Sequence, residues 1–268
     1  MIRERVISAL WVALLLVAAV LWLPQFWSAA ALSLVLLAAA WEWSGFVAPG
    51  RVALRLLFVA GAIGLCLLWW AISGDQAGLQ ALLWAACAFW CVALLWVFAS
   101  PGRVGRGRVT LSGLLALSFA WLAVVRMRTG WEHGGQMVMY ALLIVWLADS
   151  GAYFAGRAFG QRKLAPLVSP GKTWAGLWGG FVACALLALA VAWLKQLPLL
   201  PLLAVTLVAG LFSVVGDLTE SLCKRFAGVK DSGSLIPGHG GVLDRFDSLL
   251  AAVPPLLLAA VLFPELHA

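Results

Sequence analysis

Residues 199–215 read LLPLLAVTLVAGLFSVV, seventeen residues without a charge, and residues 216–225 follow directly as GDLTESLCKR. A helix needs about 20 mostly apolar residues to cross the roughly 30 Å of hydrocarbon in a bilayer. The apolar run therefore predicts a membrane-spanning helix. The charged residues that follow it predict a polar region at one membrane face.

Apolar runs of this kind recur along the whole chain. Hydrophobic residues make up 64% of the sequence and charged residues 11%, whereas about 25% of the residues in soluble domains are charged. So few charges cannot cover the surface of a water-soluble protein, so lipid is the solvent for most of the chain. We predict an all-α polytopic membrane protein with about nine spanning helices, at residues 7–23, 29–47, 53–72, 79–98, 109–125, 137–154, 174–194, 199–215 and 249–263.

The first run has two interpretations. Arg3 and Arg5 precede it, which is the arrangement of a secretory signal peptide. The sequence Pro24-Gln25-Phe26-Trp27 is a poor cleavage site because it lacks small residues, and eight more runs follow. A retained signal anchor is the better interpretation.

The distribution of positive charge predicts the orientation in the membrane. A net charge of +7 would be compatible with nucleic-acid binding in a soluble protein. Here, if the N-terminus is cytoplasmic and all nine runs cross, fifteen Lys and Arg residues face the cytoplasm and three face the other side. Cytoplasmic loops are the ones enriched in these residues. We therefore expect a multi-pass protein of a bacterial-type inner (plasma) membrane, with a cytoplasmic N-terminus, a polar site facing the cytoplasm and no nucleic-acid partner.

The polar groups are divided unequally between two parts of the chain. Residues 1–135 are N-terminal transmembrane helices joined by short loops, with few candidates for chemistry. Residues 136–268 hold nearly all the informative polar groups, with their highest concentration at residues 216–248, termed the signature segment. We predict that this C-terminal transmembrane region carries the chemistry.

The signature segment interleaves acids, bases and glycines. If its start is helical, Asp217, Ser221 and Lys224 share one face by their i, i+4 and i+7 spacing. Mg²⁺ prefers carboxylate oxygens and takes one or two from protein, with phosphate and water completing its shell. A loop that only sets topology needs Lys and Arg but not carboxylates among them. The candidate metal ligands are Asp217, Asp244 and Asp247, and the candidate phosphate-binding cations are Lys224, Arg225, Lys230 and Arg245.

Two residues of the segment keep alternative interpretations. His239, between two glycines, fits a phosphate donor, an acid/base group or a structural hydrogen-bonding residue equally well. Glu220 lies four residues before Lys224, so a helical ion pair is enough to explain it.

Three other sites outside the segment carry polar groups in unusual places. Asp149 follows an apolar run and precedes small residues, which allow helices to approach closely but do not explain a carboxylate. Lys172 and Thr173 directly precede another apolar run; without the full glycine spacing of a P-loop, they still form a reasonable anion site at a helix N-terminus. Glu42 lies between Trp41 and Trp43, where a carboxylate costs a few kcal/mol unless it is paired inside the protein or reaches the interface.

Together these motifs resemble the phosphatidate cytidylyltransferases, also called CDP-diacylglycerol synthases. The resemblance rests on Ser221-x-x-Lys224-Arg225, Lys230-Asp231, His239-Gly240-Gly241 and Asp244-Arg245-x-Asp247 at these spacings. The runs Asp149-Ser150-x-Ala152-Tyr153 and Ser169-Pro170-x-Lys172-Thr173-Trp174 match as well. One position departs from the family pattern: Ala175 stands where the family usually has Glu, so either no acid acts there or another carboxylate, such as Glu42, replaces it.

The resemblance implies a reaction in phospholipid biosynthesis. CTP and phosphatidic acid would give CDP-diacylglycerol and pyrophosphate, with Mg²⁺, and with or without a second cation. The implied partners are CTP, phosphatidic acid and membrane lipids, and whether the chain is a monomer or a homodimer stays open. The implied roles are metal binding by Asp217 and Asp244, with Asp247 and Asp149 as further candidates, substrate binding by Lys172, Thr173, Ser221, Lys224 and Arg225, and catalysis by Lys230, Asp231, His239 and Arg245.

Two rival functions remain. A CTP-dependent kinase of a lipid alcohol, such as a polyprenol, would need a base for its hydroxyl substrate, for which Asp231 or His239 would serve. An ion-coupled transporter would spread polar groups through several spans, whereas these cluster at one membrane face.

Overall fold

The computed structural model describes residues 13–99, 104–235 and 240–266, and nearly all of them are helical. Residues 13–21 form the described part of the first helix. The bounds of the other elements are α2 Gln25–Val47, α3 Val52–Ile72, α4 Gln76–Ala99, α5 Arg106–Gly130, α6 Gly134–Phe159, β1 Lys163–Ala165, β2 Ser169–Thr173, α7 Trp174–Lys195, α8 Leu199–Ala227, α9 Leu243–Leu262 and the 3₁₀ turn η1 Pro264–Leu266.

The predicted spans correspond to helices of the structure. Eight helices within the described residues, α2 to α9, are long and apolar enough to cross a membrane. The first predicted span, residues 7–23, begins outside the described residues. The predicted and observed bounds differ most at the end of α8: the predicted span ends at residue 215, whereas the helix continues to Ala227. Polar side chains end a hydrophobic run without ending a helix. The protein is therefore a multi-pass membrane protein.

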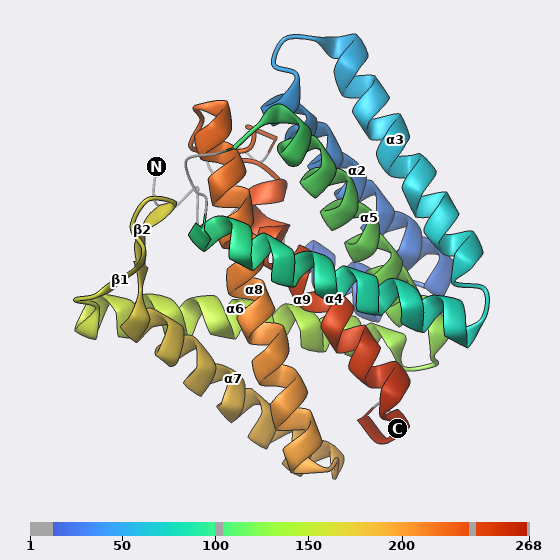
Figure 1. Cartoon of the computed structure of the whole chain (residues 1–268). Coiled ribbons are helices and arrows are strands. Elements are labelled where there is room, and N and C mark those ends of the chain that lie inside the picture. Colours follow the sequence, from blue (N-terminus) through green and yellow to red (C-terminus); the bar gives the residue numbers. More distant parts are fainter. Residues whose placement is uncertain (1–12, 100–103, 236–239, 267–268) are drawn as a thin grey trace.

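Helix α9 lies at the centre of the bundle. In its most apolar window 78% of the residues are buried within the protein, against 11% for α3. It packs against α8 on one side and against α5 and α4 on the other, as the red helix in Figure 1 shows. Pro254 and Pro255 lie inside this helix and are buried, so its neighbours protect the break in backbone hydrogen bonding from lipid. The C-terminal part of the chain is thus packed directly against the N-terminal part.

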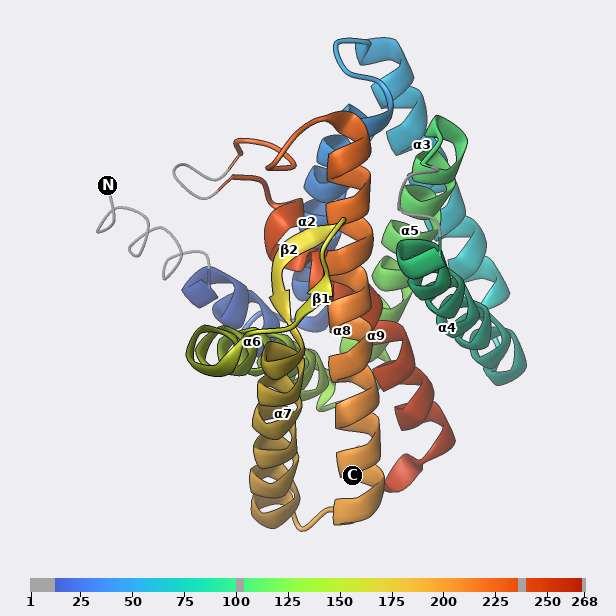
Figure 2. The ribbon, with the colours of Figure 1, turned by 60° about the vertical axis from the view of Figure 1, so that its left-hand side comes forward.

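Helices α6 and α7 pack closely through small residues. A Cβ atom at Gly151 of α6 would lie 2.5 Å from the carbonyl oxygen of Gly179 in α7, so only glycine permits this approach. Helix α7 then runs beside α8, as Figure 2 shows. These three helices form one wall of the polar region described below.

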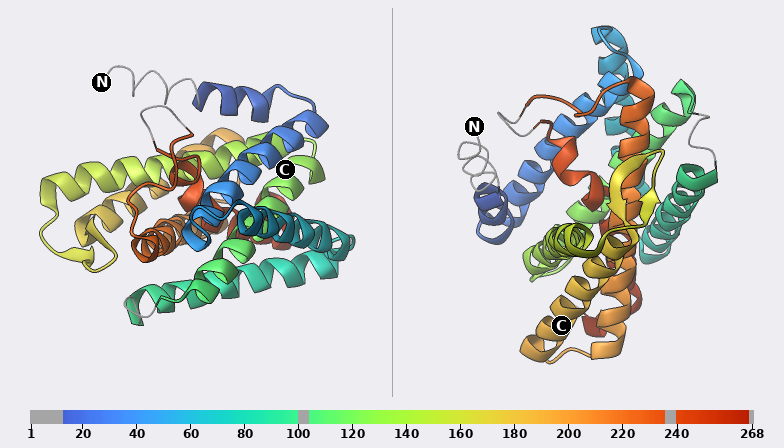
Figure 3. Two further views of the ribbon diagram at one scale, coloured as in Figure 1. Left: turned by 90° about the horizontal axis from the view of Figure 1, so that it is seen from above. Right: turned by 90° about the vertical axis from the view of Figure 1, so that its left-hand side faces the viewer.

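A short antiparallel hairpin, β1–β2, joins α6 to α7, with Lys163 opposite Thr173 and Ala165 opposite Ser169. The expectation of an all-helical chain did not include it, because strands of three and five residues are too short to show an alternating pattern. The hairpin lies against α8 (Figure 3), where Arg225 donates a hydrogen bond to the Val168 carbonyl oxygen at 3.4 Å. It brings Lys172 to the polar end of α8.

Polar groups near the other ends of the helices are bound within the protein. Arg126 of α5 hydrogen-bonds to Ser73, and Arg128 to Ser28 and the Leu23 carbonyl oxygen. Lys195, at the end of α7, donates to Gln136 at the start of α6. These three cations, which were predicted to face away from the cytoplasm, therefore lie at the helix ends opposite to the hairpin and the signature segment.

The α6–α7 contact generates a stability prediction. Replacement of Gly179 by Leu should lower the free energy of unfolding by about 1–3 kcal/mol, because the new side chain would force the two helices apart. Gly64→Leu is the matched control, since a Cβ there meets nothing within 4 Å. Unfolding of the purified protein in detergent measures both; equal stability of the two variants would contradict the described packing.

Candidate functional site

The polar end of α8 supplies the first side chains of the site. The helix has 29 residues and is therefore roughly 43 Å long at about 1.5 Å per residue, which exceeds the hydrocarbon thickness of a bilayer. Its last turns carry Asp217, Glu220, Ser221 and Lys224. The Ser221 hydroxyl donates to Asp217 Oδ1 at 3.2 Å, so the predicted helical face is present.

Lys224 lies between two carboxylates. Its Nζ is 2.5 Å from Glu220 Oε2 and 2.8 Å from Asp244 Oδ1 at the start of α9. The Glu220 side chain is only 1% exposed, and neither of its oxygens accepts a hydrogen bond of good geometry within the described residues. Lys224 is consequently the cation that compensates Glu220.

Asp244 contacts both the end of α8 and the loop of the signature segment. Its Oδ2 accepts hydrogen bonds from the backbone N–H groups of Ser232 and Gly241, each at 2.9 Å, and lies 2.9 Å from the Ser232 hydroxyl. Gly240 has a φ of +80°, and a Cβ there would lie 3.0 Å from Asp244 Oδ2. A glycine is thus needed where the segment turns back onto this carboxylate.

A second lysine approaches the same region from the hairpin. Lys172 Nζ is 2.6 Å from Asp217 Oδ2. Asp149 and Asp247 both lie near enough to Asp217 for their charges to repel it. Asp247 is buried and also lies within hydrogen-bonding distance of Glu220. We refer to five carboxylates, those of Asp149, Asp217, Glu220, Asp244 and Asp247, as the acid cluster; Lys172 and Lys224 lie among them.

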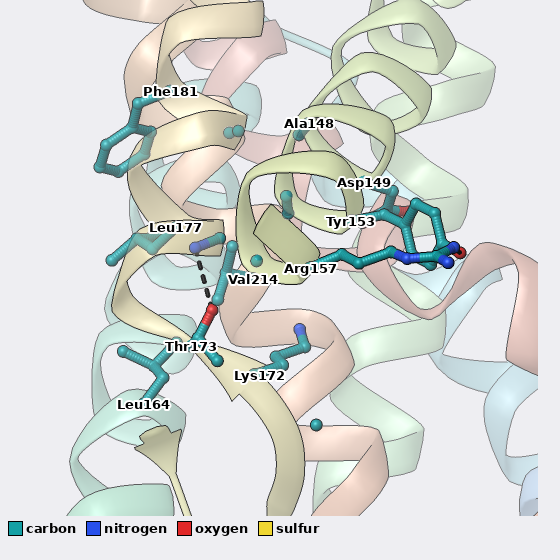
Figure 4. A pocket seen from close by; sticks show the side chains of 16 residues that line it. Ala148, Asp149, Tyr153, Arg157, Leu164, Lys172, Thr173, Leu177, Phe181 and Val214 are labelled. Carbon is teal, nitrogen blue, oxygen red and sulfur yellow. Dashed lines mark hydrogen bonds between the residues drawn. The ribbon is translucent and has the colours of Figure 1, made fainter. Parts of the chain in front are cut away.

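A cavity of about 380 Å³ opens beside the acid cluster, between α6, α7, α8 and the hairpin. Asp149, Tyr153 and Arg157 follow one side of α6 at four-residue spacing, and Lys172 and Thr173 approach from the hairpin (Figure 4). The Arg157 guanidinium donates to the Tyr153 hydroxyl at 3.0 Å. The rest of the lining is largely apolar, with Leu164, Leu177, Phe181 and Val214 among it. One cavity thus offers cations at one part and an apolar surface at another.

The remaining predicted site residues are less closely grouped. The Thr173 hydroxyl accepts a hydrogen bond from the Gly176 N–H at 3.1 Å and caps α7, so it has a structural partner besides any ligand. Asp231 lies beside Gly240. Lys230, Arg225 and Arg245 are exposed, and His239 lies outside the described residues. The predicted catalytic and substrate-binding roles stay predictions.

Sequence reasoning did not single out Arg157 and Tyr153 as site residues. Tyr153 and Arg157 follow Asp149 by four and eight residues, and this helical spacing was the signal that places them on its side of the helix. Glu42 was left between two interpretations, and the structure buries it against the signature segment: it is 3% exposed and accepts a hydrogen bond from the Leu243 N–H at 2.8 Å. It therefore faces the start of α9 and not the solvent.

The acid cluster has the donor chemistry for a divalent cation. Among the described residues, no group of three or more His, Cys, Asp or Glu side chains is arranged to hold a metal ion by itself. Mg²⁺ does not require one, because phosphate and water supply most of its ligands in nucleotide sites. Five carboxyl groups and two lysines make up the cluster, so oxygen donors outnumber the cations that pair with them. The cluster therefore fits a bound cation.

Comparison with known proteins identifies relatives over nearly the whole chain. The model of the cytidylyltransferase family matches residues 3–263. A protein of Haemophilus influenzae named phosphatidate cytidylyltransferase is 40% identical, over 95% of this chain and 96% of the relative. Proteins of the same name from Pseudomonas aeruginosa and Bacillus subtilis are 39% and 37% identical, over 98% and 78% of this chain and 97% and 81% of the relatives.

The position of Lys224 generates a second stability prediction. Lys224→Met should destabilise the protein by about 3–5 kcal/mol, because it leaves the buried Glu220 carboxylate without its cation. Adding Glu220→Gln should restore part of that loss, since the amide carries no charge. Chemical unfolding in detergent measures the single and double variants. A double variant no more stable than the single one would show that Lys224 does not compensate Glu220.

Proposed function

The chain belongs to the cytidylyltransferase family, and we propose that it transfers CMP from CTP to phosphatidic acid, giving CDP-diacylglycerol and pyrophosphate. The single observation that carries the proposal is the position of Lys172. It lines the amphipathic cavity and also lies 2.6 Å from Asp217 of the acid cluster. A lipid phosphate in the cavity and a metal-bound nucleotide at the cluster would therefore meet at this lysine.

The cavity supports phosphatidic acid as the acceptor. Lys172 and Arg157 offer cationic nitrogen atoms to a phosphate monoester, and Arg can bind two of its oxygens at once. Leu177, Phe181 and Val214 offer an apolar surface to the attached glycerol ester and the first part of an acyl chain. A soluble sugar or nucleoside would gain little from this apolar lining.

The reaction needs charge neutralisation more than proton transfer. A phosphate oxygen of phosphatidic acid attacks the α-phosphorus of CTP, a new P–O bond forms, and the bond to the β-phosphate oxygen breaks as pyrophosphate leaves. Because the attacking oxygen is already anionic, no general base is required. Positioning two polyanions and stabilising the charge of the leaving group are the main demands on the protein.

We assign Mg²⁺ to the acid cluster, with Asp217 and Asp247 as its first candidate ligands and Asp149 nearby. When bound, the ion neutralises phosphate oxygens and polarises the reacting phosphorus centre. Asp244 is a candidate as well, but its Oδ2 already accepts two backbone hydrogen bonds and its Oδ1 pairs with Lys224. Glu220 and Asp244, which both pair with Lys224, support a second cation less well than Asp149 does.

The remaining cations would complete the phosphate site. Lys230, Arg225 and Arg245 are exposed, and we assign them to the nucleotide phosphates. Lys224 already contacts two carboxylates, which favours an organising role over direct phosphate binding. A catalytic function for Asp231 is not required by the reaction, since its nucleophile needs no deprotonation.

We further propose that the site faces the cytoplasm of a bacterial-type inner membrane. CTP is a soluble cytoplasmic nucleotide, and phosphatidic acid lies in the bilayer, so the site must lie at a membrane face. The excess of Lys and Arg in the loops on the side of the signature segment supports the cytoplasmic face and a cytoplasmic N-terminus.

Analysis of the reaction products tests the proposed function. The purified protein in mixed micelles with CTP, phosphatidic acid and Mg²⁺ should release pyrophosphate and form CDP-diacylglycerol in equal amounts, and removal of Mg²⁺ by a chelator should stop both. Release of CDP together with a newly phosphorylated lipid alcohol would instead identify a lipid kinase. Uptake of a solute into vesicles without turnover of CTP would exclude both enzyme functions and support the transporter.

A further inference from the structure

Glu42 is a buried carboxylate of the N-terminal part of the chain that contacts the signature segment. It belongs to α2, yet its Oε1 accepts a hydrogen bond from the Val242 N–H at 3.1 Å and its Oε2 from the Leu243 N–H at 2.8 Å. Its Oε2 also lies 2.9 Å from the Ser232 hydroxyl. Within the described residues, the hydrogen-bond partners of this carboxylate are N–H and O–H groups of a segment about 200 residues further along the chain.

These contacts cap the central helix from another helix. Helix α9 begins at Leu243, and Val242, its own N-cap residue, makes no side-chain cap. The first N–H groups of a helix have no partner within the helix, and a negative charge is stabilising at this end. Glu42 supplies both the acceptor and the charge. It therefore determines where α9 starts relative to α2.

The cap is connected to the acid cluster through Ser232. The Ser232 hydroxyl lies 2.9 Å from Glu42 and 2.9 Å from Asp244 Oδ2, so it stands between the two carboxylates. Asp244 in turn pairs with Lys224 at 2.8 Å. A displacement of the Glu42 carboxylate would therefore pass through Ser232 to Asp244 and Lys224.

Two glycines of the signature segment are required by the same carboxylate. A Cβ at Gly233 would lie 2.5 Å from Glu42 Oε1, and a Cβ at Gly241 would collide with Glu42 and Ser232. Neither glycine has a positive φ. The close approach of Glu42, and not an unusual turn, accounts for glycine at these positions.

We propose that Glu42 is a positioning residue for CMP transfer: it holds Ser232 and the start of α9 in place, so that Asp244 and Lys224 occupy their positions in the acid cluster. The proposal rests on the proposed function for its kinetic consequences. The N-terminal part of the chain thereby contributes to the site through a helix cap. The cavity for the lipid, which α6, α7, α8 and the hairpin line, lies outside this connection.

Replacement of Glu42 by Gln tests the proposal with little change in side-chain volume. The amide offers one acceptor oxygen and no charge to the two N–H groups, so the segment should lose its alignment. We expect kcat to fall about 10–100-fold, the range found for residues that orient metal ligands, with the KM for phosphatidic acid changed less than about 3-fold. Glu42→Asp, which keeps the charge, should recover part of kcat. Glu132→Gln, at an exposed position, is the matched control.

Hydrogen exchange provides a readout that does not depend on activity. In the wild-type protein the amides of Val242 and Leu243 should be protected, and in Glu42→Gln the amides of Ser232, Gly241, Val242 and Leu243 should exchange faster, while those of α7 stay unchanged. If Glu42→Gln does not fold, Ser232→Ala removes only the bridging hydroxyl and should give a smaller fall in kcat with the same unchanged KM.

Several outcomes would overturn the proposal. One is a wild-type kcat per folded molecule in Glu42→Gln; another is a loss of activity that follows only the amount of folded protein. Unprotected Val242 and Leu243 amides in the wild type would also overturn it. Absence of CTP turnover in the wild type would instead refute the proposed function, and the exchange data would still decide whether Glu42 anchors the segment.

Discussion

The charge balance of the acid cluster is the constraint on which the rest of the structure depends. Five carboxylates lie near one end of an apolar helix bundle, and two lysines lie among them. A buried charge without a partner is strongly destabilising, so each lysine must reach its carboxylate. Lys224 does so along α8 and across to α9, and Lys172 does so because the β1–β2 hairpin lies against α8. The packing of these elements and the ion pairs of the site therefore depend on each other.

The same arrangement connects the fold to the chemistry. The small residues of α6 and α7 bring these helices together beside α8, and the cavity lies between them and the hairpin. Its cationic part borders the acid cluster through Lys172, and its apolar part is suited to a lipid. A protein of this family must bring together a soluble nucleotide and a membrane lipid. The structure accommodates both demands at the end of a helix that is longer than the bilayer is thick.

The sequence predicted the spans well, because hydrophobicity is a local property of each run. It also predicted that Asp217, Ser221 and Lys224 share a helical face, which depends only on helical spacing. It did not predict that Lys224 pairs with Asp244 while Lys172 pairs with Asp217, because these pairs depend on how α8, α9 and the hairpin pack. Glu42 illustrates the same limit: its partners are about 200 residues away in the chain, and no local pattern contains that information.

A titration with a divalent cation tests, independently of turnover, the proposal that the acid cluster binds such an ion. Mn²⁺, used as a paramagnetic substitute for Mg²⁺, can be titrated into the purified protein and followed by electron paramagnetic resonance. We expect saturable binding that weakens at least about 10-fold in Asp217→Asn and is unchanged in Glu132→Gln. Equal Mn²⁺ affinity of the wild-type protein and Asp217→Asn would contradict it.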